Sequence, residues 1–323
     1  MIEYFSLKSS GVSTGEWESF VDSSDNGTIF HTRLFLSYHP KDRFEDASLV
    51  VKKDNQILAL FPAVVIKRDG LKILSSHSGA SYGGFAYKQN LNLKEAFELV
   101  ESLLNYAKDL KCDRIQLTPP PMIYQTKYSN YIDFALVKNN FGYLKREVSS
   151  VVQLDVPKDE LLSTYRAEAR TAVKKAIKQG VEIAECERFA DYYEILKKNL
   201  KMRHNVDPTH TLDELLKLKR MFPGKISLWG AFLGEKLIAG VCNFSANKGV
   251  VLAFYISHDE DYQEYRAVNL LFYEIMKRYK DEGFKFLDFG IFTVNMDPNW
   301  GLGRFKENFG ARGIFRDTFY KDI

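Results

Sequence analysis

The chain alternates between two hydrophobic periods, and each change of period marks a predicted element. In the first half, two β-rich apolar stretches within residues 49–66 surround a turn at 52–55, a pattern that predicts a β-meander. Apolar positions in 93–110 then recur every three to four residues, as in an amphipathic helix. A short strand at 115–117 follows, and three prolines at 119–121 end it because proline cannot continue a hydrogen-bonded ladder.

The second half repeats this order of elements. Its expected strands and helix, in chain order, occupy residues 227–233, 236–244, 250–256, 267–279 (the helix) and 284–289. A meander followed by a helix and one further strand is an α+β pattern, unlike the strand–helix alternation of doubly wound sheets. We therefore expect a mixed α/β protein of the α+β class, with two tandem domains whose sheets are mostly antiparallel and flanked by helices.

The expected boundary between the domains lies near residues 145–150, before the apolar run at 151–154. This divides the chain into an N-terminal domain, 1–148, and a C-terminal domain, 149–323. No G-x-G-x-x-G follows a predicted strand, and no G-x-x-x-x-G-K-[ST] occurs. The sequence therefore argues against Rossmann and P-loop nucleotide sites.

The composition limits the kinds of partner. The 323 residues are 45% apolar and 27% charged, the balance of an ordinary globular protein. Lys and Arg number 45 against 42 Asp and Glu, so the net charge is only +3. Because domains that bind nucleic acid through their overall charge are strongly basic, this balance argues against DNA binding, and any anion site must be local.

Cysteine and histidine spacing favours neither a metal site nor a disulfide framework. The three cysteines lie far apart, and the six histidines have no H-E-x-x-H or H-x-H spacing. The first residues lack a basic region followed by an apolar one, and the longest apolar run, 57–66, contains Pro62 and is too short to span a bilayer. We therefore expect a cytoplasmic protein with no metal and no membrane span.

The most informative predicted helix runs from residue 158 to residue 179. Pro157 is typical of a helix start and Gly180 of a helix end. Four cations spaced four residues apart form one stripe along it: Arg166, Arg170, Lys174 and Lys178. Such a stripe is either a solvated face or an anion site. For an anion site, Arg166 and Arg170 are the better candidates, because guanidinium groups match phosphate oxygens.

A second candidate site lies near the C-terminus. Leu302, Phe305 and Phe309 share one face of a short predicted helix, so Lys306 is expected to point off that face and to be exposed. A lysine beside a cleft can stabilise an oxyanion or an anionic leaving group; the alternative is an ordinary surface lysine. Asp288, at the end of the preceding strand, is a candidate general base or a carboxylate that holds a neighbouring loop.

These residues belong to a longer motif. The segment Asp288-Phe289-Gly290, followed by a loop and by residues 303–310 (GRFKENFG), resembles the C-terminal signature of the FemAB-like proteins, which are tandem GNAT-type acyltransferases. The basic helix at 158–179 is similar to the helix that opens the second domain in that family. The resemblance implies two GNAT folds and transfer of an acyl or aminoacyl group to an amine of a cell-envelope precursor, such as a peptidoglycan or polysaccharide precursor.

The resemblance also implies roles for individual residues. Lys306 would contact the donor end or the oxyanion, Phe305 would wall the donor channel, and Arg166 and Arg170 would contact phosphate. The donor would be acyl-CoA or aminoacyl-tRNA, which makes tRNA a candidate partner, and no cofactor would be tightly bound. The acceptor would be a small-molecule, lipid-linked or nucleotide-linked precursor. The acyl group and the oligomeric state stay open.

One departure from the GNAT pattern concerns the expected phosphate loop. CoA-dependent members hold the pyrophosphate on backbone N–H groups of a Q/R-x-x-G-x-G/A loop at a helix start. In the matching segment, 263–268, Gln263 fits but both glycines are absent, and a tyrosine and Arg266 restrict close approach of the backbone. Gln263 and Arg266 are the candidates for donor binding there. The alternative to an enzyme is a binding module that kept the fold and lost the chemistry.

Overall fold

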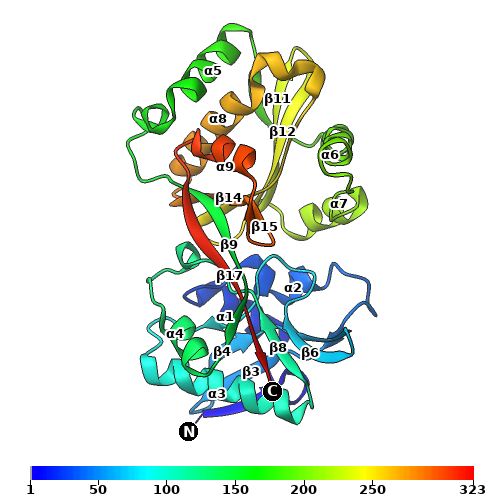
Figure 1. Ribbon diagram of the computed structural model, residues 1–323, viewed down its shortest axis with the longest axis vertical. Helices are drawn as coiled ribbons and strands as arrows, with labels where there is room; N and C mark the ends of the chain where they lie inside the picture. Colours follow the sequence, from blue (N-terminus) through cyan, green and yellow to red (C-terminus); the bar gives the residue numbers. More distant parts are fainter. Residues whose placement is uncertain (1) are drawn as a thin grey trace. The chain divides into compact units, whose positions relative to one another are not determined.

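The computed structural model describes residues 2–323, apart from the side chains of Arg203 and His204. The chain divides into two compact units, which Figure 1 shows as ribbons. The first unit comprises the residues up to Glu147 together with Phe315–Ile323, and the second unit comprises Val148–Ile314.

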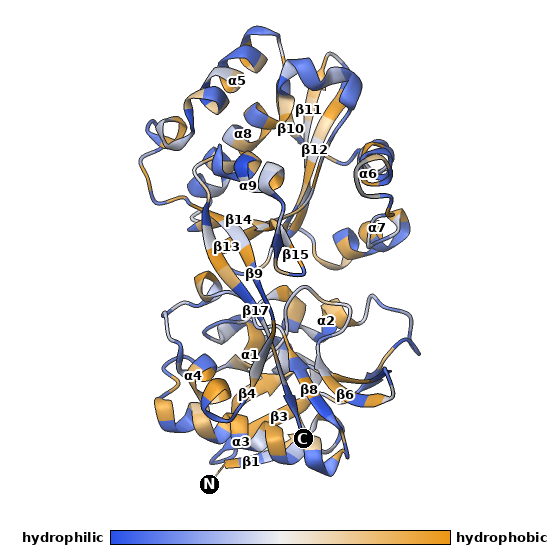
Figure 2. Cartoon of the chain, viewed as in Figure 1, coloured by the Kyte–Doolittle hydropathy of each residue, from blue (hydrophilic) through white to orange (hydrophobic). Residues whose placement is uncertain are grey.

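The first unit is built on two groups of strands. One sheet has the order β1–β3–β4–β7, with bounds Ile2–Ser6, Leu49–Lys53, Gln56–Phe61 and Ala86–Tyr87. The other group has the order β17–β8–β6–β5–β2, with bounds Arg312–Asp322, Arg114–Leu117, Leu71–Ser76, Val64–Arg68 and Glu45–Asp46. Strands β3 and β4 are largely hydrophobic (Figure 2) and lie in the core of the unit.

Four helices accompany these strands: α1 (Thr14–Ser23), α2 (Arg33–Leu36), α3 (Leu93–Asp109) and α4 (Tyr131–Lys138). Helix α3 confirms the prediction for 93–110. Its buried face carries Ala96, Leu99, Val100, Leu103 and Ala107 at the expected helical spacing. This face packs on β1 and β3 and so closes the core of the first unit.

The second unit has one sheet with the order β10–β11–β12–β13–β14–β9. The bounds of these strands are Glu182–Cys186, Ile226–Leu233, Lys236–Ser245, Val250–His258, Phe286–Ile291 and Gly142–Gln153; the last of them, β9, belongs to this unit only from Val148 on. Neighbouring strands are antiparallel except for β13 and β14, which are parallel. A small hairpin, β15 (Thr293–Val294) and β16 (Asp297–Pro298), follows β14.

Helices cover both faces of this sheet (Figure 1). Their bounds are Ala167–Lys178 for α5, Phe189–His204 for α6, Leu212–Met221 for α7, Ala267–Asp281 for α8 and Trp300–Glu307 for α9. Helices α5 and α8 pack together, and α8 lies on β11, β12 and β13. Helix α6 lies on β12 and β13, and α7 lies on β11. The mixed α+β class with mostly antiparallel sheets and flanking helices is confirmed in both units.

Each unit contains one parallel strand pair joined by a long helix. In the first unit β6 and β8 pair along four positions, up to Ser76 opposite Leu117, with α3 between them in the chain. In the second unit β13 and β14 pair along only three positions, from Val250 to Leu252 on β13, with α8 between them. Beyond Leu252, β13 continues along β12 and β14 continues along β9, so the two strands separate.

The C-terminal strand departs from the expected domain division. The sequence placed residues 149–323 in one domain, whereas 315–323 belong to the first unit. The reason is the pairing of β17 with β8, in which Phe319 lies opposite Leu117 and is fully buried in the first core. Because this pairing joins positions about 200 residues apart in the chain, local hydrophobic patterning does not reveal it.

The basic helix is shorter than predicted. Residues 158–166 do not belong to it: α5 begins at Ala167, after a 3₁₀ turn at Leu161–Thr164. The Ser163 and Thr164 hydroxyls donate to nearby backbone carbonyls, and the backbone N–H of Arg166 donates to the Asn308 carbonyl. These contacts compete with helical hydrogen bonds and delay the helix start by a little over two turns.

Candidate functional site

The second unit contains a cavity of about 1020 Å³. This volume is at the upper end of the range for small-molecule sites. Its walls come from α5, α6, α8 and α9 and from the part of β13 that lies beyond the parallel pair. The separation of β13 from β14 leaves Ile256, Ser257 and His258 of β13 available to line it.

The start of α8 borders this cavity. Arg266, Ala267, Val268 and Asn269 are lining residues, as is Gln263 in the preceding turn. Arg266 is the N-cap residue of α8, and no side-chain hydrogen bond caps the helix there. The first backbone N–H groups of a helix need partners from outside it, and the helix dipole makes this end favourable for anions. The geometry therefore suits a phosphate group.

Arg266 keeps a backbone conformation that glycine adopts more easily. Its φ is +55° and its ψ is +30°, in the left-handed region. The backbone therefore turns into the helix as it would with a glycine at this position. The expectation that the side chain of Arg266 limits close approach of a phosphate to the backbone stays a prediction. The guanidinium adds a positive charge at the same place, and Lys175 of α5 adds a second cation to the lining.

The rest of the lining mixes apolar and polar side chains, and Glu168 of α5 adds one acidic group. Phe305 and Leu302 come from α9, Leu196 and Leu200 from α6, and Ile256 from β13. Apolar walls exclude water and strengthen the attraction between charged groups at the rim. The cavity thus combines two cations, Arg266 and Lys175, with apolar side chains from three elements, a combination that suits an acyl group attached to a phosphate-bearing carrier.

The structure corrects the expected exposure of Lys306. Its side chain is only 3% exposed, and its Nζ donates to the carbonyls of Gly290 and Ile291 at 2.8 and 2.7 Å. Burial lowers the pKa of Lys306 to about 8, although the nearby Asp288 carboxylate favours the charged form. Lys306 does not line the cavity. It fixes α9, and with it Phe305, to the end of β14.

Asp288 also holds the turn around Gly290. Its carboxylate is fully buried and accepts hydrogen bonds from the Ser149 hydroxyl at 2.6 Å and from the Gly290 backbone N–H at 2.7 Å. These contacts match the loop-holding alternative for this residue. Asp288 and Lys306 together hold the turn around Gly290, whose φ is +71°. Direct contact of either residue with a substrate stays a prediction.

The two predicted phosphate-binding arginines of the basic helix do not line the cavity. Arg166 pairs with Glu307 of α9 at 2.5 Å, and both side chains are about half exposed. Arg170 donates to the Tyr165 carbonyl at 2.6 Å, ahead of the helix start. Both guanidinium groups have partners within the second unit. Their role as phosphate contacts stays a prediction without support from these positions.

Sequence reasoning selected three lining residues, Gln263, Arg266 and Phe305, and missed most others. On α5 the cavity faces a different stripe from the cationic one: Glu168, Thr171, Ala172 and Lys175. Their spacing of three, four and seven residues is also one helical face, so it was visible in the sequence. A mixed stripe of this kind carries no charge pattern that would single it out.

Comparisons with known proteins support the fold of the chain. Residues 163–307 match the family model described as an acetyltransferase (GNAT) domain. No curated protein matches the chain. Among solved structures, the crystal structure of FemX has a TM-score of 0.76 at 15% identity, covering 99% of this chain and 97% of that one.

Two further structures have lower scores. L-PGS from Bacillus licheniformis has a TM-score of 0.60 at 12% identity, covering 96% of this chain and 92% of that one. A tandem GNAT protein from the clavulanic acid biosynthesis pathway has a TM-score of 0.54 at 9% identity, covering 100% and 98% of the two chains. The chain thus has the FemAB-like fold of tandem GNAT domains, as the C-terminal motif implied. Within the described residues, no helix has both the length and the apolar character needed to cross a bilayer.

Proposed function

We propose that the protein is an N-acyltransferase that binds an activated, phosphate-bearing donor in the second-unit cavity and transfers its acyl or aminoacyl group to an amine. The acceptor is an amine on a cell-envelope or polysaccharide precursor, the class that the FemAB-like motif implies, and the reaction takes place in the cytoplasm. In this reaction the amine nitrogen bonds to the donor carbonyl carbon, and the bond from that carbon to the carrier's sulfur or ribose oxygen breaks. The electron pair of the broken bond stays on the sulfur or oxygen, which takes up the proton that the amine releases.

The observation that carries the proposal is the start of α8. An anion placed there accepts hydrogen bonds from N–H groups that no side chain caps, beside the guanidinium of Arg266 and the ammonium of Lys175. Charge-assisted hydrogen bonds of this kind contribute about 1.5–3 kcal/mol each. Catalysis would come mainly from holding the carbonyl and the amine in a reactive arrangement.

The alternative is a binding module that holds the same kind of phosphate-bearing ligand without chemistry. The buried positions of Lys306 and Asp288 favour this alternative, because neither side chain reaches the cavity lining. In the transferase, the catalytic surface would instead be formed by the residues that line the cavity. The two functions predict the same donor affinity and differ only in turnover.

The first experiment measures donor binding by calorimetry, with acetyl-CoA, a longer acyl-CoA and an aminoacyl-tRNA as separate probes. Arg266→Ala and Lys175→Ala each remove one cation from the cavity, and each should weaken binding about 10-fold or more. Lys197→Ala is the matched control, since Lys197 is an exposed lysine of α6 outside the lining. This variant should bind as the wild type does.

The result also distinguishes the donors and the two functions. Binding of acyl-CoA alone identifies a small-molecule donor, and binding of aminoacyl-tRNA alone identifies a tRNA-dependent enzyme. Turnover with an amine acceptor separates the transferase from the binding module. The donor site is wrong if all three probes fail to bind, or if both cavity variants bind as tightly as Lys197→Ala.

A further inference from the structure

The cationic stripe along α5 (Arg166, Arg170, Lys174 and Lys178) does not line the donor cavity. Figure 1 shows α5 on the outside of the second unit, beside α8. Residues 169–181 contain four cations and no acidic residue. Like charges spaced three or four residues apart repel each other and destabilise a helix slightly. The helix dipole favours Lys178, in the last turn, but not Arg170 or Lys174. Helix formation therefore does not explain the stripe.

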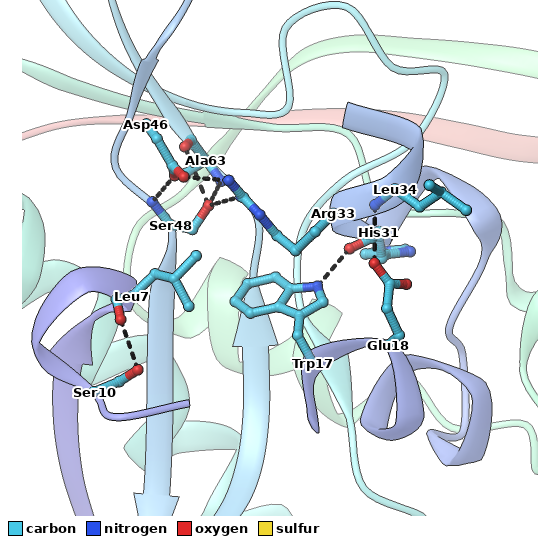
Figure 3. Close-up of polar contacts among 10 residues, drawn as sticks. All are labelled: Leu7, Ser10, Trp17, Glu18, His31, Arg33, Leu34, Asp46, Ser48 and Ala63. Atoms are coloured by element: carbon cyan, nitrogen blue, oxygen red, sulfur yellow. Dashed lines mark hydrogen bonds and ion pairs between the residues drawn. The ribbon is translucent and has the colours of Figure 1, made fainter. Parts of the chain in front are cut away.

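The two lysines of the stripe have no partner within the protein. Among the described residues no carboxylate pairs with Lys174 or Lys178, and both residues are exposed. A cation of the first unit shows the contrast: Arg33, on α2, pairs with Asp46 and donates to the Ser48 hydroxyl (Figure 3). The charges of Lys174 and Lys178 are therefore available to an anionic partner from outside the chain.

The stripe lies beside the helix face that forms one wall of the cavity. Successive residues of an α-helix are turned by about 100° around its axis, so Arg170 lies next to Thr171 and Lys174 next to Lys175. Thr171 and Lys175 line the cavity. A molecule bound along the stripe can therefore reach the cavity with a flexible arm, without leaving α5.

The side chains along α5 favour a protein partner over RNA. Ile177 is 55% exposed and lies one turn after Lys174, next to Lys178. Protein interfaces bury apolar side chains of this kind inside a polar rim. Proteins that bind single-stranded RNA stack its bases on aromatic side chains, and α5 has none. Cations around an exposed isoleucine therefore fit a protein with an acidic surface around an apolar spot.

The charges of the cavity lining suit a carrier with a single phosphate group. Arg266 and Lys175 supply two cations, and Glu168 supplies one carboxylate. His258 also lines the cavity, and its ring lies 3.6 Å from the Glu260 carboxylate, which compensates a proton on the ring. CoA carries three phosphate groups, whereas a pantetheine arm joined to a serine of a protein carries one phosphodiester. The small positive excess suits the second carrier, because burying unpaired charges is costly.

We propose that the donor is an acyl thioester on the phosphopantetheine arm of an acidic carrier protein, which docks on the cationic stripe and places its arm in the cavity. This inference rests on the proposed transferase and names its donor. The phosphodiester of the arm lies at the start of α8, beside Arg266. The amine nitrogen bonds to the thioester carbonyl carbon, and the carbon–sulfur bond breaks. The sulfur of the arm keeps the electron pair and takes up the proton that the amine releases.

The test measures binding to the full chain by calorimetry, with an octanoyl-loaded acyl carrier protein, octanoyl-CoA and an aminoacyl-tRNA as separate probes. The loaded carrier protein should bind more tightly than octanoyl-CoA. Lys174→Glu and Lys178→Glu each replace an attraction by a repulsion at the docking surface, so each should weaken binding of the loaded carrier protein about 3- to 10-fold. Octanoyl-CoA does not contact the stripe, and its affinity should change less than about 2-fold. Lys174→Arg keeps the charge and should restore carrier binding.

Two further variants separate the docking surface from the donor cavity. Lys197→Glu is the matched charge reversal at an exposed lysine of α6, and it should bind the loaded carrier protein as the wild type does. Arg266→Ala should weaken binding of the loaded carrier protein and of octanoyl-CoA alike.

Each contrary result has a distinct meaning. If octanoyl-CoA binds through Arg266 and the loaded carrier protein does not bind, the transferase stands and the carrier proposal is wrong. If none of the three probes binds, both proposals are wrong. Unchanged carrier affinity in both Lys174→Glu and Lys178→Glu would overturn the docking surface. Binding of aminoacyl-tRNA alone, weakened by these two variants, would make the stripe an RNA-binding surface and would also overturn the carrier proposal.

Discussion

The two units place a long helix between parallel strands in the same way, yet they treat the start of that helix differently. In the first unit Asn92 and Glu95 form a reciprocal cap on α3: each side chain bonds to the backbone N–H of the other residue. The Glu95 carboxylate also pairs with Lys53 and Lys88, both at 2.9 Å. The second unit leaves α8 without a side-chain cap. The first helix thus supplies its own anion, and the second helix is open to one from outside.

The parallel strand pairs of the two units differ in a corresponding way: the first is closed to its end and the second is open. Pairing of β6 with β8 continues to the last residue of each strand, and only a small cavity of about 170 Å³ is left at their ends. Pairing of β13 with β14 stops after three positions, and a cavity about six times larger, with two cations, lies beyond. The second unit thus leaves open the position at the strand ends that the first unit largely closes. The following predictions test this comparison.

The largest expected effect is the acid sensitivity of the first unit. Burial lowers the pKa values of His31 and His77 to about 4. Below pH 6.5 the unfolded chain takes up protons that the folded unit does not, so stability falls as pH drops from 6.5 to 4. Each histidine should contribute a loss of about 3 kcal/mol.

Hydrogen exchange of first-unit amides, measured at several pH values, checks this loss. His77→Asn removes one of the two groups, so its stability should fall less steeply over the same range. An identical pH dependence in the wild type and the variant would show that His77 titrates normally in the folded unit.

The second prediction removes the internal anion of α3. Glu95→Ala takes away the cap and the buried partner of two lysines, and it should lower the free energy of unfolding by about 2–3 kcal/mol. Urea unfolding measures the change. Glu101→Ala, at an exposed position of the same helix, is the control and should change stability by less than about 0.5 kcal/mol. Equal effects of the two variants would mean that α3 does not depend on its own carboxylate.

The hydrophobic period predicted α3 and α8 because each has one continuous buried face, which is a local property of the sequence. The same reasoning failed for Lys306. Helical spacing correctly places Lys306 and Phe305 on different faces of α9. It does not show that the face with Lys306 is also buried against another part of the chain. The covering groups are the carbonyls of Gly290 and Ile291, about 15 residues earlier, and no periodicity reports such a contact.

Arg266 illustrates a second limit of sequence reasoning. The absence of glycine at a position that needs a left-handed backbone argues against that conformation, because side chains other than glycine adopt it at a cost. Here the turn after β13 and the start of α8 impose it on an arginine. Tertiary structure overrides the local preference, as it also does where contacts of Ser163 and Thr164 delay the start of α5.

The third prediction concerns Lys306 as the residue that positions α9. Lys306→Ala leaves two carbonyls without their donor and removes the cation near Asp288, so stability should fall by about 2 kcal/mol. The sequence alone predicts a surface lysine and no such loss. Arg304→Ala, at an exposed position of the same helix, is the matched control for thermal unfolding.

A pH titration sharpens this test. The pKa of Lys306 is lowered from 10.5 to about 8 in the folded state. Between these two pH values the unfolded chain therefore keeps a proton on Lys306 that the folded chain has released. The Lys306 contribution therefore makes the wild type more stable as pH rises through this range, and Lys306→Ala should lack that gain. If Lys306→Ala were as stable as Arg304→Ala and kept the pH dependence of the wild type, the result would contradict the burial of the Lys306 side chain.

The smallest expected effect lies at the open end of α8. Arg266→Gly relieves the left-handed backbone, and it should raise the free energy of unfolding by about 0.5–1 kcal/mol in the absence of donor. Arg266→Ala keeps the strained conformation and should give no gain. Both variants lose the guanidinium, so both should bind the donor more weakly than the wild type. If glycine instead strengthened donor binding, close approach of the backbone would matter more than the charge, and the arginine would be an obstacle at the site and not a ligand contact.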